Sequence, residues 1–216
     1  MFIKDNLKNI IETLPEHVTL VAVSKTKTVK AILEAYNAGQ IIFGENKIQE
    51  MVDKYNELPK DIQWHMIGHL QRNKVKYMAH FVNLIHGVDD FKTLIEINKQ
   101  AKKHDRVIDC LLQAKIAQED TKYGLTFKEI EEILSSESLA ELKNIQITGL
   151  MGMASFTEDM DQVAIEFKSL NKEFQNLKNK DNNLSILSIG MSGDYPLAIE
   201  CGGNMVRIGS AIFGGR

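Results

Sequence analysis

The stretch LVAVSKTKTVKAILEAYNAGQIIFG, residues 20–44, contains one complete strand–helix–strand repeat. Residues 20–25 begin as a continuous apolar run, which is typical of a buried strand. Residues 29–38 place apolar side chains at helical spacing, and Gly39 supplies a C-terminal cap. Residues 41–44 predict a second strand. A strand, a helix and a strand in this order predict a right-handed parallel βαβ unit.

The same alternation continues along the rest of the chain. Strands are predicted over residues 20–25, 41–44, 62–68, 81–88, 107–116, 145–153, 184–191 and 205–209. Helices are predicted over residues 2–14, 29–38, 48–55, 91–103, 127–134, 163–177 and 197–199, and through Val75 and Met78. Eight such repeats predict an α/β fold: a closed (β/α)8 barrel of the TIM type, forming a single domain over residues 1–216. An open doubly wound sheet is the alternative, but no GxGxxG fingerprint follows the first strand.

The composition excludes several classes of protein. Lys and Arg total 26 and Asp and Glu total 29, which gives a net charge of −3 and does not indicate a nucleic-acid partner. No apolar run approaches the length of a membrane span. Cys110 and Cys201 stand far apart without a metal-binding pattern, so both are expected to be reduced and packed as apolar groups. We therefore expect a soluble cytoplasmic protein with no membrane partner and no metal site.

Polar residues follow the predicted strands, at the end of a barrel where active sites lie. They are Lys25, Glu45, Asn46, His69, Gln71, Asp89, Lys115, Ser155, Ser192, Asp194, Arg207, Gly209 and Ser210. The segments SIGMSGD and RIGSAIFG supply glycines, backbone amides and hydroxyls, and loops in these positions often bind phosphate. Burial lowers the pKa of a lysine and favours attack of its neutral amine on a carbonyl. Lys25 and a phosphate site facing it therefore predict a phosphorylated aldehyde held as a Schiff base.

Other polar or sulfur-containing residues have simpler interpretations. His65 and His69 are four residues apart, but they lie on a strand and the loop after it, so they do not predict a metal pair. His86 lies within an apolar strand and predicts a hydrogen-bonded histidine in the core. Met151 and Met153, judged from their pattern alone, are typical of core residues.

Seven motifs, in order, resemble those of the pyridoxal phosphate homeostasis proteins, which are similar to the barrel domain of alanine racemase standing alone. They are AVSKTK, FGENKIQE, WHMIGHLQRNK, DTKYG, GLMGM, SIGMSGD and MVRIGSAIFG. The resemblance covers nearly the whole chain and implies pyridoxal 5′-phosphate (PLP) as the cofactor. It implies a Schiff base on Lys25, phosphate contacts from Ser192, Gly209 and Ser210, Arg207 at the pyridine nitrogen, Asn46 near the ring and Met151 in the pocket wall.

The resemblance leaves the roles of two other lysines open. Lys27 is either a base or transient acceptor of the cofactor or a lysine that faces solvent, and Lys122 in DTKYG is placed at the pocket rim. Thr28 departs from the motif, since a proline commonly follows the second lysine.

The implied site favours a carrier over an enzyme. An arginine beside the pyridine nitrogen disfavours its protonation and weakens the ring as an electron sink. A two-base racemase also needs a proton donor on the face opposite Lys25. The tyrosines in predicted loops are Tyr123 and Tyr195, and nothing in their spacing places either of them on the face opposite Lys25. We expect a PLP carrier that regulates the free cofactor and passes it to apo-enzymes, as a monomer or weak dimer. A small amino-acid racemase and a Schiff-base sugar-phosphate aldolase are the alternatives.

Overall fold

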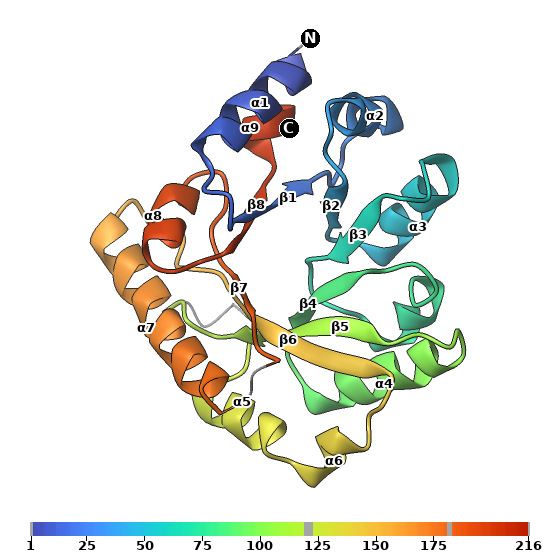
Figure 1. The fold of residues 1–216 in the computed structure, drawn as a ribbon, viewed down its shortest axis with the longest axis vertical. Coiled ribbons are helices and arrows are strands. Elements are labelled where there is room, and N and C mark those ends of the chain that lie inside the picture. Colours follow the sequence, from blue (N-terminus) through green and yellow to red (C-terminus); the bar gives the residue numbers. More distant parts are fainter. Residues whose placement is uncertain (1, 119–122, 181–182, 216) are drawn as a thin grey trace.

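The computed structural model describes residues 2–118, 123–180 and 183–215, and within these ranges eight parallel strands close into a barrel. Each strand pairs with the next along the chain, and β8 returns to pair with β1, where Val21 lies opposite Arg207. Helices surround the barrel (Figure 1). The predicted (β/α)8 fold is confirmed, and the open doubly wound sheet is excluded because β8 pairs with β1 and closes the sheet.

The strands, in chain order, are β1 (Thr19–Val23), β2 (Ile42–Glu45), β3 (Gln63–Met66), β4 (Leu84–Val88), β5 (Ile108–Ala114), β6 (Ile145–Gly152), β7 (Ile186–Ser188) and β8 (Met205–Ile208). The helices are α1 (Phe2–Thr13), α2 (Val29–Asn37), α3 (Ile48–Glu57), the 3₁₀ helix η1 (Arg72–Tyr77), α4 (Phe91–Lys102), α5 (Phe127–Leu134), α6 (Glu137–Ala140), α7 (Met160–Lys178), α8 (Tyr195–Glu200) and α9 (Ser210–Phe213).

Four elements differ from the sequence prediction. The helix predicted through Val75 is the 3₁₀ helix η1, whose preceding residue Gln71 provides no side-chain cap. Short 3₁₀ segments of this kind are common connectors. The strand predicted over residues 184–191 shortens to β7, and beyond its end Gly190 adopts φ 90°, which interrupts the extended backbone. The short helices α6, capped by Ser136, and α9, after β8, were not predicted.

The strands are buried on both faces, as expected for a parallel barrel. Inside the barrel, Val21, Leu84, Leu111, Met151 and Met205 form a small apolar cluster. A larger core fills the space between the strands and the surrounding helices. Because both faces of each strand are apolar, polar side chains inside the barrel stand out as candidates for function.

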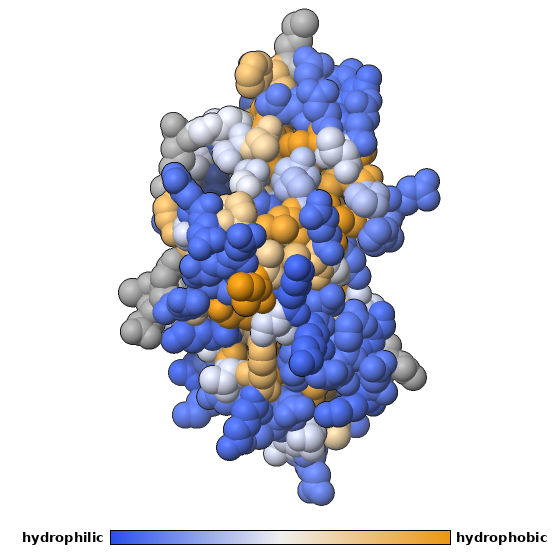
Figure 2. Space-filling model, turned by 90° about the vertical axis from the view of Figure 1, so that its left-hand side faces the viewer, coloured by the Kyte–Doolittle hydropathy of each residue, from blue (hydrophilic) through white to orange (hydrophobic). Residues whose placement is uncertain are grey.

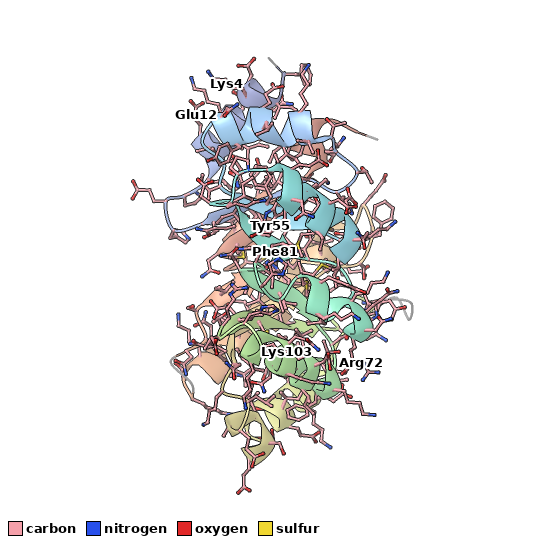
Figure 3. The ribbon with its side chains drawn as sticks, turned by 90° about the vertical axis from the view of Figure 1, so that its right-hand side faces the viewer. Lys4, Glu12, Tyr55, Arg72, Phe81 and Lys103 are labelled. Atoms are coloured by element: carbon pink, nitrogen blue, oxygen red, sulfur yellow. The ribbon has the colours of Figure 1, made fainter. Side chains whose placement is uncertain are left out.

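The outer surface is mainly hydrophilic, with exposed apolar residues in places. On the side that carries α7 and α8, apolar patches lie among hydrophilic residues (Figure 2). Met160 and Ile165 of α7 are exposed. On the opposite side, Tyr55 of α3 stacks on Phe81, with ring centroids 4.0 Å apart (Figure 3). Within the described residues, no helix has the length and apolar character required to cross a bilayer.

Candidate functional site

A cavity of about 320 Å³ opens at the carboxyl ends of the strands. It brings together six of the seven residues that the resemblance assigns to the cofactor: Lys25, Asn46, Ser192, Arg207, Gly209 and Ser210. They come from the ends of β1, β2, β7 and β8. Segments separated by almost two hundred residues therefore meet at one place, which is the end of a (β/α)8 barrel where chemistry is usually found.

Met151 is the predicted residue that the structure places elsewhere. It is fully buried in the apolar cluster inside the barrel, whereas Met153 of the same chain segment and Met191 line the cavity. Side chains two residues apart on a strand share a face. Met153 therefore continues the inward-facing row of Met151 but lies one layer closer to the barrel mouth.

Lys25 follows β1 on a tight turn, and its side chain is half-buried at the cavity. The turn is closed by a hydrogen bond from the Lys27 amide to the Ser24 carbonyl, at 3.0 Å. The next residue, Thr26, has φ 64°, a left-handed conformation that is unfavourable for a β-branched residue. Lys25 thus projects from a strained segment that its surroundings must hold in place.

On the opposite wall, the hydroxyl oxygen of Ser192 accepts two backbone N–H groups from the start of α9. The donors are the amides of Gly209, at 3.2 Å, and Ala211, at 3.4 Å. A Cβ at position 209 would lie 3.2 Å from both Cβ and the carbonyl oxygen of Val23. The glycine therefore keeps this wall close to β1. The two hydrogen bonds from the backbone amides to the Ser192 hydroxyl are long. An anionic oxygen at the same position would accept them more strongly than a hydroxyl does.

Arg207 forms the floor of the cavity and is almost completely buried. Its Nη1 donates to the carbonyl and hydroxyl oxygens of Ser188, at 2.8 and 2.6 Å, and its Nη2 donates to the Gly152 carbonyl at 2.9 Å. Burial lowers the pKa of the guanidinium to about 10, against the opposing effect of Asp194. The group therefore remains cationic at neutral pH and is fixed in orientation.

Two buried histidines extend this hydrogen-bond chain across the barrel interior. His86 Nδ1 lies 3.0 Å from Ser188 Oγ, and His86 Nε2 lies 3.1 Å from His65 Nδ1. Among the described residues, His86 Nδ1 is the acceptor available to the Ser188 hydroxyl proton, so His86 carries its own proton on Nε2 and donates it to His65. Burial lowers the pKa of His65 to about 3 and that of His86 well below its usual value. Both imidazoles are therefore neutral. The prediction that His86 is a hydrogen-bonded core histidine is confirmed.

The structure assigns Lys27 a contact that neither sequence interpretation included. Its ammonium donates to the carbonyls of Phe213, Gly214 and Gly215, at 3.4, 3.0 and 2.9 Å. These carbonyls lie at the last residue of α9 and at the two residues after it, and the two glycines line the cavity. Lys27 therefore fastens the C-terminal segment to the cavity wall. Lys122 lies outside the described residues.

The two tyrosines considered as acid–base partners lie apart from the cavity. The Tyr195 hydroxyl is 3.2 Å from Thr13 Oγ1 of α1. Tyr123 is exposed and stacks on His69, with ring centroids 4.3 Å apart. His69 in turn lies 3.0 Å from an Asp89 carboxylate oxygen.

Across the described residues, no three His, Cys, Asp or Glu side chains are placed to hold a metal ion.

Sequence reasoning missed a set of buried charges behind Lys25. Glu45, at the end of β2, accepts hydrogen bonds from Ser24 Oγ and from Lys54 of α3. Burial raises the pKa of Glu45, while Lys54 and Ser24 oppose this shift. Glu50 of α3 also pairs with Lys54, at 2.7 Å. The i,i+4 spacing of Glu50 and Lys54 was the one available signal, and it is typical of any solvated helix.

The family model for the alanine racemase N-terminal domain matches residues 2–216. A pyridoxal phosphate homeostasis protein of Vibrio alginolyticus is 40% identical over 207 residues, covering 94% of this chain and 88% of the relative.

Solved structures give the same result. PipY of Synechococcus elongatus PCC7942, solved with PLP bound, superposes with a TM-score of 0.90 at 33% identity, over 98% of this chain and all of PipY. The alanine racemase of Clostridium difficile 630 shares the fold, with a TM-score of 0.78 at 16% identity, and this chain covers 56% of it. The chain therefore belongs to the pyridoxal phosphate homeostasis proteins of the alanine racemase N-terminal domain family.

Proposed function

We propose that this protein binds PLP in the cavity at the barrel mouth, holds it on Lys25 and takes part in PLP homeostasis without catalytic turnover. One observation carries the proposal: an amine, a fixed guanidinium and an anion-binding set of backbone amides line a single cavity of about 320 Å³. The proposal is supported by PipY, a 33% identical relative whose structure was solved with PLP bound.

Each part of the cavity has a proposed task. The Lys25 amine condenses with the aldehyde carbon to form a Schiff base, and one water leaves. Ser192, Ser210 and the Gly209 amide hold the phosphate, which is favoured by backbone N–H groups that converge on the position of the Ser192 hydroxyl. Asn46, half-buried at the rim, lies beside the ring.

Arg207 is proposed to face the pyridine nitrogen. PLP supplies an electron sink when that nitrogen is protonated, and a neighbouring cation disfavours the protonation. Ser188 and Gly152 hold the guanidinium by three hydrogen bonds, so it cannot easily rotate away. The site therefore favours retention of the cofactor over carbanion chemistry.

The positions of the tyrosines also favour a carrier over a racemase. Tyr195 is engaged with Thr13, and Tyr123 is exposed beside His69. A racemase needs a second acid–base group on the face opposite Lys25. We propose that the protein exchanges the aldehyde with apo PLP-dependent enzymes.

Borohydride trapping tests the proposal. The protein is incubated with PLP, reduced, digested and searched by mass for modified peptides. We expect one dominant modification, on Lys25, and loss of both this modification and the visible absorption band in Lys25→Ala. Lys30→Ala, an exposed lysine of α2, is the matched control and should behave like the parent. Scattered modification, or labelling that persists without Lys25, would contradict the assignment.

Racemisation provides the test of non-catalytic function. The PLP-loaded protein is incubated with L- or D-alanine, and the enantiomers are separated over time. We expect no interconversion above that of free PLP. Sustained turnover that disappears in Lys25→Ala would establish the racemase alternative instead.

A further inference from the structure

A buried charged network surrounds the turn that carries Lys25. Ser24 Oγ donates to Glu45 Oε1 at 2.6 Å, and Lys54 Nζ donates to the same oxygen at 2.7 Å and to the Ser24 carbonyl at 2.8 Å. Glu45 is fully buried and Lys54 is 6% exposed. Desolvation offsets much of the attraction in such a pair, so stability alone is a weak reason for it. Its location next to Lys25 indicates a role at the site.

The network also holds the residue on the other side of Lys25. Thr26 adopts φ 64°, which a β-branched side chain rarely tolerates. Its N–H donates to Glu50 Oε1 at 2.5 Å, and the same oxygen accepts from Lys54 Nζ at 2.7 Å. Lys25 is therefore clamped on both sides, at Ser24 by Glu45 and Lys54 and at Thr26 by Glu50.

The clamp is mounted on a rigid element. Glu50 and Lys54 lie one turn apart on α3, so their charged groups project from the same face. The neighbouring Tyr55 stacks on Phe81 just before β4, with an angle of 11° between the rings (Figure 3). Met51 of the same helix is fully buried in the core. Small movements of the Lys25 turn are therefore resisted by a packed helix.

We propose that Glu45, Glu50 and Lys54 are positioning residues that aim Lys25 into the cavity and restrict Schiff-base formation to it. The inference rests on the proposed function, in which Lys25 binds the aldehyde. Lys27 lines the same cavity only two residues later. A turn that relaxed its φ angle at the intervening residue would move both amines, so a fixed turn is what distinguishes them.

The test measures where and how fast the cofactor is trapped. Glu50→Ala and Lys54→Met are incubated with PLP, reduced with borohydride at set times and digested, and the label on Lys25 and Lys27 is quantified. We expect labelling of Lys25 to slow by about tenfold, since small misplacements of a reacting group have effects of this size or larger. A growing share of the label should appear on Lys27. Glu12→Ala, an exposed pair member on α1, is the control and should match the parent.

Two further variants separate positioning from general stability. Glu50→Gln keeps an acceptor for the Thr26 N–H and should recover most of the Lys25 labelling rate. In a Thr26→Gly background, Glu50→Ala should have a much smaller effect, because glycine adopts φ 64° without strain. If Lys54→Met fails to fold, the more accessible Glu50 position carries the test, since its side chain is 25% exposed.

The outcomes distinguish failure of the positioning role from failure of the proposed function. If the parent is labelled on Lys25 and the Glu50 and Lys54 variants keep its rate and site of labelling, the positioning role is wrong. If the parent itself is not labelled on Lys25, the proposed function fails, and the inference fails with it.

Discussion

Arg207 and the two histidines behind it show how single residues set the electrostatics of the site. The guanidinium is the charged end of a chain that continues through Ser188, His86 and His65. A second positive charge in that chain would lie beside Arg207 in a region of low dielectric constant, where repulsion is strong. The chain therefore works as a positioning support only while both imidazoles are neutral.

This neutrality makes stability depend on pH. The pKa of His65 is lowered to about 3 and that of His86 is lowered well below its usual value, chiefly by burial. In the unfolded chain both titrate near pH 6.5, so protons favour unfolding. Their contribution is fully present above about pH 6.5 and is lost as the pH falls from there toward 3, with a slope approaching about 1.4 kcal/mol per pH unit for each histidine.

Urea unfolding of His86→Gln between about pH 6 and 4.5 measures this slope. The free energy of unfolding should fall less steeply in the variant than in the parent, by about 1.4 kcal/mol per pH unit. Carboxylates titrate in the same range, and the difference between variant and parent removes their contribution. The exposed His17→Gln is the control and should keep the parent slope. Equal slopes for His86→Gln and parent would show that His86 is not held neutral.

At the scale of elements, β6 and β7 approach each other closely at Gly149. Gly149 lies opposite Ile186, and a Cβ at position 149 would fall on the Ile186 carbonyl oxygen. Backbone cannot move aside as a flexible side chain can. β7 has only three residues, and its last residue, Ser188, supports Arg207.

Gly149→Ala should therefore destabilise the fold by about 3 kcal/mol or more, at the upper end of the usual cost of overpacking. It should also weaken PLP binding, because β7 and Ser188 would shift. Urea unfolding and PLP titration check the two effects. Gly193→Ala is the control for stability, since nothing lies within 4 Å of the added Cβ. A variant as stable as the parent would mean that β6 and β7 can separate without loss.

The sequence predicted elements better than contacts between them. Buried parallel strands are continuous apolar runs, so β1 to β8 were recognisable without knowledge of their partners. The depth of Met151 was not recognisable, because Met153 shares its face and only the barrel register shows which reaches the mouth. The ion pair between Glu45 and Lys54 could not be predicted from the sequence, since it depends on how α3 packs against the ends of β1 and β2.

At the scale of the whole molecule, the two ends of the chain meet beside the site. Helices α1 and α9 lie together at the top of Figure 1, and Asn6 Nδ2 donates to the Ile212 carbonyl at 3.0 Å. The segment after α9 then passes along the cavity, where Lys27 binds its carbonyls. Helix α1 thus supports α9, and the segment after α9 forms part of one wall of the cavity.

Lys27→Met removes this attachment and should speed the release of PLP. The segment containing Gly214 and Gly215 would be free to leave the cavity wall, and faster dissociation by roughly tenfold corresponds to about 1.4 kcal/mol. The rate is followed by the loss of visible absorption after rapid dilution of the loaded protein. Lys30→Met on α2 is the control.

The same variant decides between two roles for Lys27. If Lys27 only fastens the segment, borohydride trapping at saturating PLP should still modify Lys25 to the level of the parent while release is faster. If Lys27 is a transient acceptor, the label on Lys25 should accumulate more slowly, because the aldehyde would lose its intermediate carrier. An unchanged release rate would show that the C-terminal segment does not retain the cofactor. Because the ammonium already donates to three carbonyls, we expect the first result.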